Sequence, residues 1–239
     1  MNVILFWIGD GLMDSIIFGV FALAYVLLFA WGLRIHKRWS LTSTIFLVIA
    51  ALIYDNTIYA LGTLIGEGDL LKTLNILRFW FHALFTPTLT LFSIGAMREA
   101  NIKWAQSSWV LVLGILYTIV AIIIEYQTEL NGLVLEVSKD YGAVSYSSIG
   151  EASGPPIMIL MVTMALLLGS IMLWWKAQWP WMFVGTLIMT IGSAVPIDVG
   201  SNAMTNAFEL ILLSTLVWTK KQLDLKALSN HVSRGAVIR

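Results

Sequence analysis

Ionisable side chains recur at helical spacing inside apolar stretches of this chain, and such side chains can transfer protons or bind charged groups. Asp55 and Tyr59 lie four residues apart, so in a helix they share one face. Arg78 and His82 share a face in the same way, and Glu209 lies in the last apolar stretch. Charged side chains inside a membrane usually line a cavity or pair with one another. We therefore expect these side chains to meet in one chamber.

Glu209, Asp55 and His82 are the candidate catalytic residues. Glu209 has no basic residue on its own stretch before Lys220, so it should find a partner elsewhere or stay protonated. A neutral carboxylic acid in an apolar pocket can give a proton to an alkene or an epoxide. Asp55 could instead form a buried ion pair with Arg78 that only joins two helices. His82 could act as an acid or base, or as a structural hydrogen-bond donor.

Six side chains in the same parts of these apolar stretches are candidates for binding a substrate. They offer amides, a cation or aromatic faces, and aromatic faces can stabilise a cationic intermediate. Each also has a structural interpretation, since amides join membrane helices by hydrogen bonds and aromatic rings face lipid or pack in the core. The six are Asn56, Tyr59, Arg78, Trp80, Asn202 and Asn206. Further aromatic residues crowd the same zone, namely Phe6, Trp7, Tyr54, Phe79 and Phe81.

Seven apolar stretches must position these side chains. The chain has 239 residues, of which 59% are hydrophobic and 12% charged, a composition typical of membrane proteins. A helix of about 20 apolar residues crosses a bilayer. We predict an all-α integral membrane protein, a seven-transmembrane-helix bundle forming one domain over residues 1–239. The predicted spans are Gly11–Leu33, Leu41–Gly62, Leu74–Ala96, Ser107–Ile124, Pro155–Trp175, Trp179–Pro196 and Ser201–Thr219.

The distribution of basic residues predicts how the bundle is oriented. Eleven of the 14 Lys and Arg residues fall on one side, in the loops after the first, third and fifth spans and in the C-terminal segment. Cytoplasmic loops carry such an excess. The N-terminus is therefore expected outside and the C-terminus in the cytoplasm of a multi-pass protein. The polar positions of all the stretches then lie at comparable depth in the outer half of the membrane.

Two segments outside the spans have patterns of their own. Residues 125–154 contain two β-rich runs around a turn with Gly142, which predicts a hairpin on the outer side. It would be either a lid over the bundle or a surface decoration. Residues 220–239 form a cytoplasmic tail, which would either extend the last helix or lie as an amphipathic helix on the inner leaflet.

Several classes of site are excluded by composition. The chain has no cysteine and three histidines, of which His36 and His231 fall on the cytoplasmic side, so a thiolate or multi-histidine metal site in the outer cavity is not expected. The last span carries no lysine for a retinal Schiff base, and no Gly-rich phosphate loop or nucleic-acid signature is present. We expect no metal and no cofactor, and a membrane lipid or isoprenoid as the partner.

The chain resembles the integral-membrane terpene cyclases, the seven-span family of meroterpenoid and indole-terpenoid pathways. The resemblance covers the length, the span count and the positions of Asp55 and Glu209 in the second and last spans. It implies that these two acids carry a protonation-initiated cyclisation. The family pattern has no role for Arg78. If Arg78 pairs with Asp55, Glu209 becomes the better proton donor.

Three functions therefore stand open. The leading one is a membrane-embedded enzyme that acts on an isoprenoid or similar lipid, as a proton-initiated terpene cyclase or isomerase. The second is an outer-leaflet lipid phosphatase or hydrolase, in which Arg78 and His82 hold phosphate and Asp55 orients His82. The third is a non-catalytic seven-helix receptor, transporter or ligand-binding protein.

Overall fold

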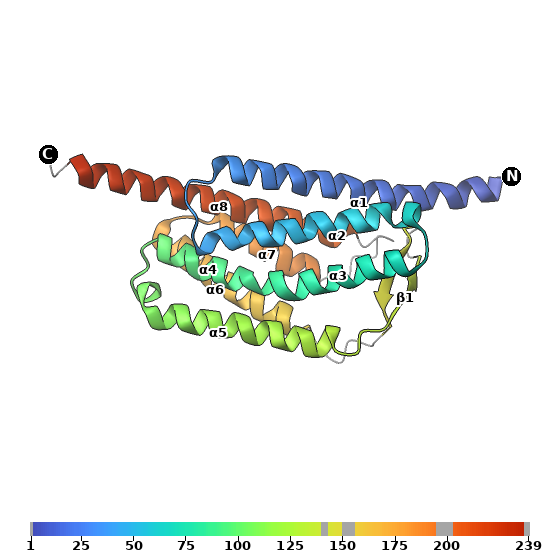
Figure 1. Cartoon of the computed structure of the whole chain (residues 1–239). Helices are drawn as coiled ribbons and strands as arrows, with labels where there is room; N and C mark the ends of the chain where they lie inside the picture. The colour runs from blue at the N-terminus through green and yellow to red at the C-terminus, as the bar shows by residue number, and fades with distance from the viewer. Residues whose placement is uncertain (1, 140–142, 150–155, 195–202, 237–239) are drawn as a thin grey trace.

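Long helices lie side by side along one direction and form a bundle (Figure 1). The computed structural model describes residues 2–139, 143–149, 156–194 and 203–236, with side chains described between 14 and 229. The long helices are α1 (Asn2–Ile35), α2 (Ile45–Ile65), α3 (Asp69–Phe85), α4 (Leu89–Glu99), α5 (Ser108–Glu125), α6 (Ile157–Ala177), α7 (Trp181–Ala194) and α8 (Ala203–Ala236). Short helical turns are η1 (Leu41–Thr44), η2 (Thr86–Thr88), η3 (Lys103–Gln106) and η4 (Tyr126–Leu130).

The predicted all-α fold class is confirmed. Within the described residues, five helical segments are long and apolar enough to cross a membrane, and they overlap the first five predicted spans. They are Asp14–Ile35, Leu41–Ile65, Asp69–Glu99, Ser108–Leu130 and Ile157–Ala177. The sixth predicted span corresponds to the shorter apolar helix α7, and the seventh lies in α8.

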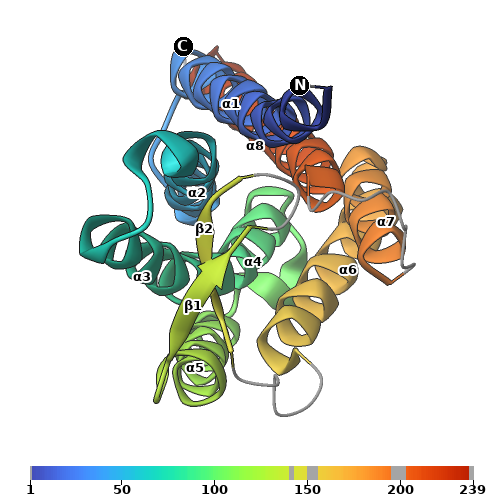
Figure 2. The same ribbon diagram turned by 90° about the vertical axis from the view of Figure 1, so that its right-hand side faces the viewer.

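The third of these segments is not one continuous α-helix. Pro87 has no backbone N–H and its ring crowds the preceding turn, so the helix breaks there. Residues Thr86–Thr88 form the 3₁₀ turn η2 between α3 and α4. Viewed end-on, α4 lies at the centre of the bundle with the other helices around it (Figure 2). Eight of its residues, from Leu89 to Met97, are buried, so α4 forms much of the core.

A hairpin is present in the segment where the sequence predicts one. β1 (Leu135–Ser138) pairs antiparallel with β2 (Ser145–Ser148), with Leu135 opposite Ser148. The side chains of Leu135 and Tyr146 pack against Ile58 of α2 and Leu71 of α3. The Tyr146 hydroxyl accepts a hydrogen bond of 3.1 Å from the Gly68 backbone N–H. The hairpin is thus attached to the end of the bundle where α2 meets α3.

The opposite end of the bundle is held by a buried ionic cluster. α8 continues past Thr219 as one helix, so the start of the predicted tail belongs to the folded core. Lys220 Nζ donates hydrogen bonds to the Arg38 carbonyl, to Thr42 Oγ1 and to Asp224 Oδ2, each at 3.2 Å. Arg38 also lies 3.4 Å from Glu99 Oε1. These contacts tie α8 to the α1–η1 loop and to the end of α4.

His36 lies beside this cluster in a setting that disfavours its charged form. Its ring packs against Trp39 in a tilted arrangement and against Phe46 edge to face, at centroid distances of 4.4 and 5.6 Å. Both ring nitrogens are buried without a hydrogen-bond partner among the described residues. Burial lowers the pKa of His36, and the Lys220 cation lowers it further against the opposing effect of Asp224. The folded chain therefore holds this histidine neutral near pH 7.

This lowered pKa predicts a loss of stability in acid. The unfolded histidine takes up a proton near its ordinary pKa of about 6.5, at a pH where the folded one does not, so the free energy of unfolding decreases as the pH falls below that value. His36→Gln should weaken this dependence between pH 7 and pH 5. Thermal unfolding in detergent across that pH range measures it. Equal slopes for the variant and the unaltered chain would contradict the prediction.

Helix packing predicts a second stability effect, at Gly95 of α4. A Cβ atom there would lie 2.6 Å from Leu41 Cβ and 3.0 Å from the Thr42 backbone nitrogen, so η1 would have to move. Gly95→Ala should lower the free energy of unfolding by about 1–3 kcal/mol, as overpacking does in other cores. Gly19→Ala is the control, since its Cβ would meet only Ala60 Cβ at 3.9 Å. Equal unfolding midpoints for the two variants would refute the close packing.

Candidate functional site

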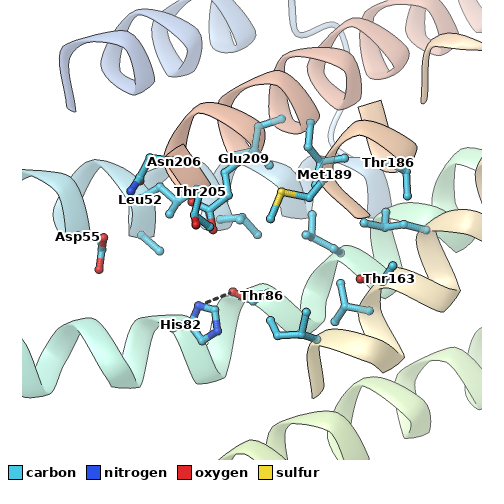
Figure 3. A pocket seen from close by; sticks show the side chains of 18 of the residues that line it. Leu52, Asp55, His82, Thr86, Thr163, Thr186, Met189, Thr205, Asn206 and Glu209 are labelled. Carbon is cyan, nitrogen blue, oxygen red and sulfur yellow. Dashed lines mark hydrogen bonds between the residues drawn. The ribbon is translucent and has the colours of Figure 1, made fainter. Parts of the chain in front are cut away.

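A cavity of about 350 Å³ lies inside the bundle, with walls from α1, α2, α3, α4, α6, α7 and α8. Cavities of this size accommodate small organic ligands. Polar side chains face it from several helices that are far apart in the sequence (Figure 3). The polar wall residues are Asp55, Tyr59, Arg78, His82, Thr86, Thr163, Thr186, Thr190, Thr205, Asn206 and Glu209. Apolar wall residues include Phe18, Val48, Leu52, Leu89, Ile159, Val162, Leu166, Met189, Leu212 and Leu213.

Arg78 is enclosed by partners on one side of the cavity. Its Nε donates a hydrogen bond of 2.7 Å to Asp55 Oδ1, and its Nη1 donates one of 2.5 Å to Asn75 Oδ1. The guanidinium carbon lies 3.7 Å above the Tyr59 ring. The spacings Asn75–Arg78 and Asp55–Tyr59 place these pairs on single faces of α3 and α2. The ion pair considered from the sequence is therefore present, and it balances the charge of Asp55.

Glu209 has no such partner. Its carboxyl group lines the same cavity as Asp55, and no residue in the described part of the chain donates a hydrogen bond to it or forms an ion pair with it. Figure 3 shows Glu209 on α8 and His82 on α3, on opposite sides of the cavity. On α8, the cavity-lining neighbours of Glu209 beyond Asn206 are apolar, with Leu212 and Leu213 one turn further on. A carboxyl group in such surroundings is most stable in its neutral form.

His82 joins the cavity to a buried carboxylate that the sequence analysis missed. Its Nδ1 lies 3.3 Å from Thr86 Oγ1, and its Nε2 lies 3.7 Å from Glu125 Oε1. Glu125 is the last residue of α5 and is 7% exposed. The predicted fourth span ended at Ile124, which put Glu125 in a loop. The helix instead continues as a π-helix, η4, and buries this residue. The sequence offered one signal for this continuation: the residues up to Leu130 are compatible with a helix.

Asn56 and Asn206 connect three helices. Asn56 Nδ2 donates to Asn206 Oδ1 at 2.8 Å and to the Leu52 carbonyl at 2.9 Å. The Tyr25 hydroxyl of α1 donates to the Asn206 carbonyl at 3.0 Å. Such hydrogen bonds join helices in membranes. Asn206 also lines the cavity, whereas Asn56 does not, and Asn202 lies outside the described residues.

Most of the predicted aromatic lining lies elsewhere. Trp80 does not line the cavity; its ring lies 6.0 Å from the Tyr126 ring. Tyr54 packs on Phe81, and Phe79 packs with the hairpin residues. The side chains of Phe6 and Trp7 lie outside the described ones. Phe18 and Tyr59 are the aromatic rings on the described wall, and they stack on each other at 4.6 Å.

No protein-family model matches the chain, and comparisons with curated proteins and with solved structures return no match either. Function must therefore be argued from the geometry of the cavity. Among the described residues, no group of three or more His, Cys, Asp or Glu side chains could hold a metal ion.

The Asp55–Arg78 contact predicts a large coupling in stability. Asp55→Asn leaves a buried guanidinium without its counter-ion, and breaking such a pair costs about 3 kcal/mol or more. Arg78→Met should cost a similar amount, and the double variant should lose less than the two single losses added together. Unfolding in mixed detergent micelles measures all three.

The exposed Glu67–Lys139 pair, at 2.6 Å, provides a control. Glu67→Gln should change the free energy of unfolding by less than about 1 kcal/mol, as is usual for surface pairs. If the losses in the free energy of unfolding of Asp55→Asn and Arg78→Met simply add in the double variant, the buried contact contributes no more than the surface one.

Proposed function

We propose that the chain is a membrane-embedded enzyme that binds an isoprenoid or similar apolar lipid in the cavity and isomerises or cyclises it by protonation. Glu209 is the proton donor. One observation carries the proposal: Glu209 is a carboxyl group with no partner among the described residues, and it faces a largely apolar cavity. Desolvation keeps such an acid protonated, which is the form that general acid catalysis requires.

The proposal includes a seven-span bundle with the N-terminus outside and the C-terminus in the cytoplasm. Five segments have the length and composition of spans, α7 is a shorter apolar helix, and α8 passes beside it. The two termini lie at opposite ends of the bundle (Figure 1). The ionic cluster with Arg38 and Lys220 lies at the proposed cytoplasmic end, and the hairpin lies at the proposed outer end. This arrangement supports the orientation expected from the basic residues.

The proposed reaction begins when Glu209 gives its proton to a carbon–carbon double bond of the substrate. The π electrons form the new C–H bond, and the neighbouring carbon becomes cationic. Asp55 is a poor second donor because Arg78 already binds its carboxylate. Asp55 and Arg78 instead form a fixed polar wall. The substrate is held by the apolar wall residues of α4, α6 and α8.

The cavity favours a single proton transfer over a long cyclisation cascade. Extended cation migration needs aromatic faces along its path. Arg78 lies over the Tyr59 ring and Phe18 stacks on it, so both faces of that ring are occupied. A double-bond isomerisation, or a cyclisation with one ring closure, requires less stabilisation of this kind. We therefore favour an isomerase within the class that the terpene-cyclase resemblance suggests.

The shortage of free aromatic surface also favours a second candidate, a protein that binds an apolar ligand without converting it. The lipid phosphatase is favoured less. It needs Arg78 to bind phosphate, but Asp55, Asn75 and Tyr59 already occupy that side chain.

Deuterium incorporation tests the catalytic proposal. The protein in lipid nanodiscs is incubated in D₂O with prenyl alcohols and polyunsaturated lipids, and the lipids are analysed by mass spectrometry. Carbon-bound deuterium is expected with the unaltered chain. Glu209→Gln should lower its rate by about 10²-fold or more, because an amide cannot supply the proton. Binding of a fluorescent apolar probe to the cavity should be retained.

Glu67→Gln is the matched control, since it also removes a carboxylate but lies at the surface away from the cavity. It should leave the deuterium rate unchanged. Equal rates for Glu209→Gln and Glu67→Gln would overturn the proposed role of Glu209. Probe binding with no deuterium uptake by the unaltered chain would favour the ligand-binding alternative.

A further inference from the structure

We propose that Thr86, His82 and Glu125 form the proton-accepting side of the cavity, opposite Glu209, and that Glu125 is the positioning residue of this group. This inference rests on the proposed function. A protonation-initiated isomerisation needs a base as well as an acid, because the cation must lose a proton to end as a neutral alkene. Glu209 cannot easily do both at two different carbons of a substrate in a narrow cavity.

The geometry gives each member of the group a distinct place. Thr86 lies on the cavity wall, at the point where Pro87 breaks the third membrane segment. Its Oγ1 is 3.3 Å from His82 Nδ1. On the other side of the imidazole ring, Nε2 faces Glu125 Oε1 at 3.7 Å. The three side chains therefore lie in a row that leads from the cavity toward α5.

This row determines which ring nitrogen carries the proton. A carboxylate facing Nε2 favours the tautomer with the proton on Nε2, since it attracts the N–H dipole. Nδ1 then has a free lone pair and accepts the Thr86 hydroxyl proton. The hydroxyl oxygen of Thr86 in turn presents its lone pairs to the cavity. The same ordering of a histidine by a carboxylate recurs in catalytic sites.

In the acceptor step, a C–H bond next to the cationic carbon breaks, and its electron pair forms the new C=C bond. The released proton passes to Thr86 Oγ1 while the Thr86 hydroxyl proton moves to His82 Nδ1. His82 becomes an imidazolium, whose charge is balanced by the Glu125 carboxylate. One proton leaves Glu209 and one reaches His82, so the substrate is isomerised with no net gain or loss of protons.

The burial of Glu125 supports its role as the residue that positions His82. Its side chain is 9% exposed, whereas that of His82 is 46% accessible, as fits a ring on the wall of a cavity. Other charges also act on the pair: Asp55 and Arg78 on His82, and Glu129, one turn further along, on Glu125. Among the described residues, Glu125 is the anion within ion-pair distance of His82.

Two substitutions of Glu125 separate its functions. Glu125→Gln keeps an oxygen dipole that faces Nε2 but cannot balance the imidazolium charge. Glu125→Leu removes both. The ¹⁵N NMR spectrum of histidine-labelled protein reports which ring nitrogen is protonated, with His82→Gln used to assign the His82 signal. Deuterium incorporation into lipid measures turnover, as described above for Glu209.

We expect the Nε2–H tautomer in the unaltered chain and in Glu125→Gln, and a mixture of tautomers in Glu125→Leu. Turnover should decrease roughly tenfold or more in Glu125→Gln, as for carboxylates that orient other histidines. Thr86→Val should lose turnover with the tautomer unchanged. Thr90→Val is its matched control, because that buried hydroxyl has no hydrogen-bond partner among the described residues and does not line the cavity.

A purely structural role for Glu125 would leave turnover in Glu125→Gln equal to that of the unaltered chain, and this result would overturn the proposal. An unchanged tautomer in Glu125→Leu would overturn it as well. If the unaltered chain shows no turnover on any lipid, the failure belongs to the proposed function. The tautomer measurements then still decide whether Glu125 orients His82.

Discussion

The buried contact between Arg78 and Asp55 is the constraint on which the rest of the cavity depends. A guanidinium inside a membrane bundle is tolerated only when its charge is balanced and its N–H groups are bonded. Asp55 balances the charge, Asn75 accepts a second hydrogen bond, and Tyr59 covers one face. These partners join α2 to α3. Under the proposed function, the same contacts make Asp55 a poor acid and leave Glu209 as the proton donor.

Much of the fold follows from hydrophobic length and helical spacing, and these features could be read from the sequence. Five of the predicted spans coincide with helices long enough to cross a membrane, and the hairpin lies where two β-rich runs flank a turn. The shared face of Arg78 and His82 was likewise visible, because residues four apart lie on one face of a helix. Patterns among neighbouring residues were sufficient for features that neighbouring residues form among themselves.

Contacts between elements distant in sequence were harder to predict. Glu125 follows an apolar span directly, so the sequence pattern assigns it to the membrane surface. Only the packing of α5 beside α3 brings it to His82. Trp80 is the opposite case, because its depth was predictable but its direction was not. It shares the depth of the polar stripe but lies on another face of α3, against Tyr126. Depth in the membrane is predictable from position along a span, whereas the direction of a side chain depends on helix rotation and on neighbours.

In the proposed reaction, the charge balance of the cavity walls separates two kinds of proton chemistry. On the α8 side, Glu209 has no cation beside it among the described residues, and an uncompensated carboxyl group in apolar surroundings favours its neutral form. On the α3 side, the Glu125 carboxyl group lies 3.7 Å from His82, and in the proposed reaction it balances the charge of the protonated imidazole. Under the proposal, a substrate in the cavity receives a proton at one carbon from Glu209 and loses one at another carbon on the His82 side. The pairing of Arg78 with Asp55 makes this division workable, because a free guanidinium in the cavity would ionise Glu209 and oppose the charging of His82.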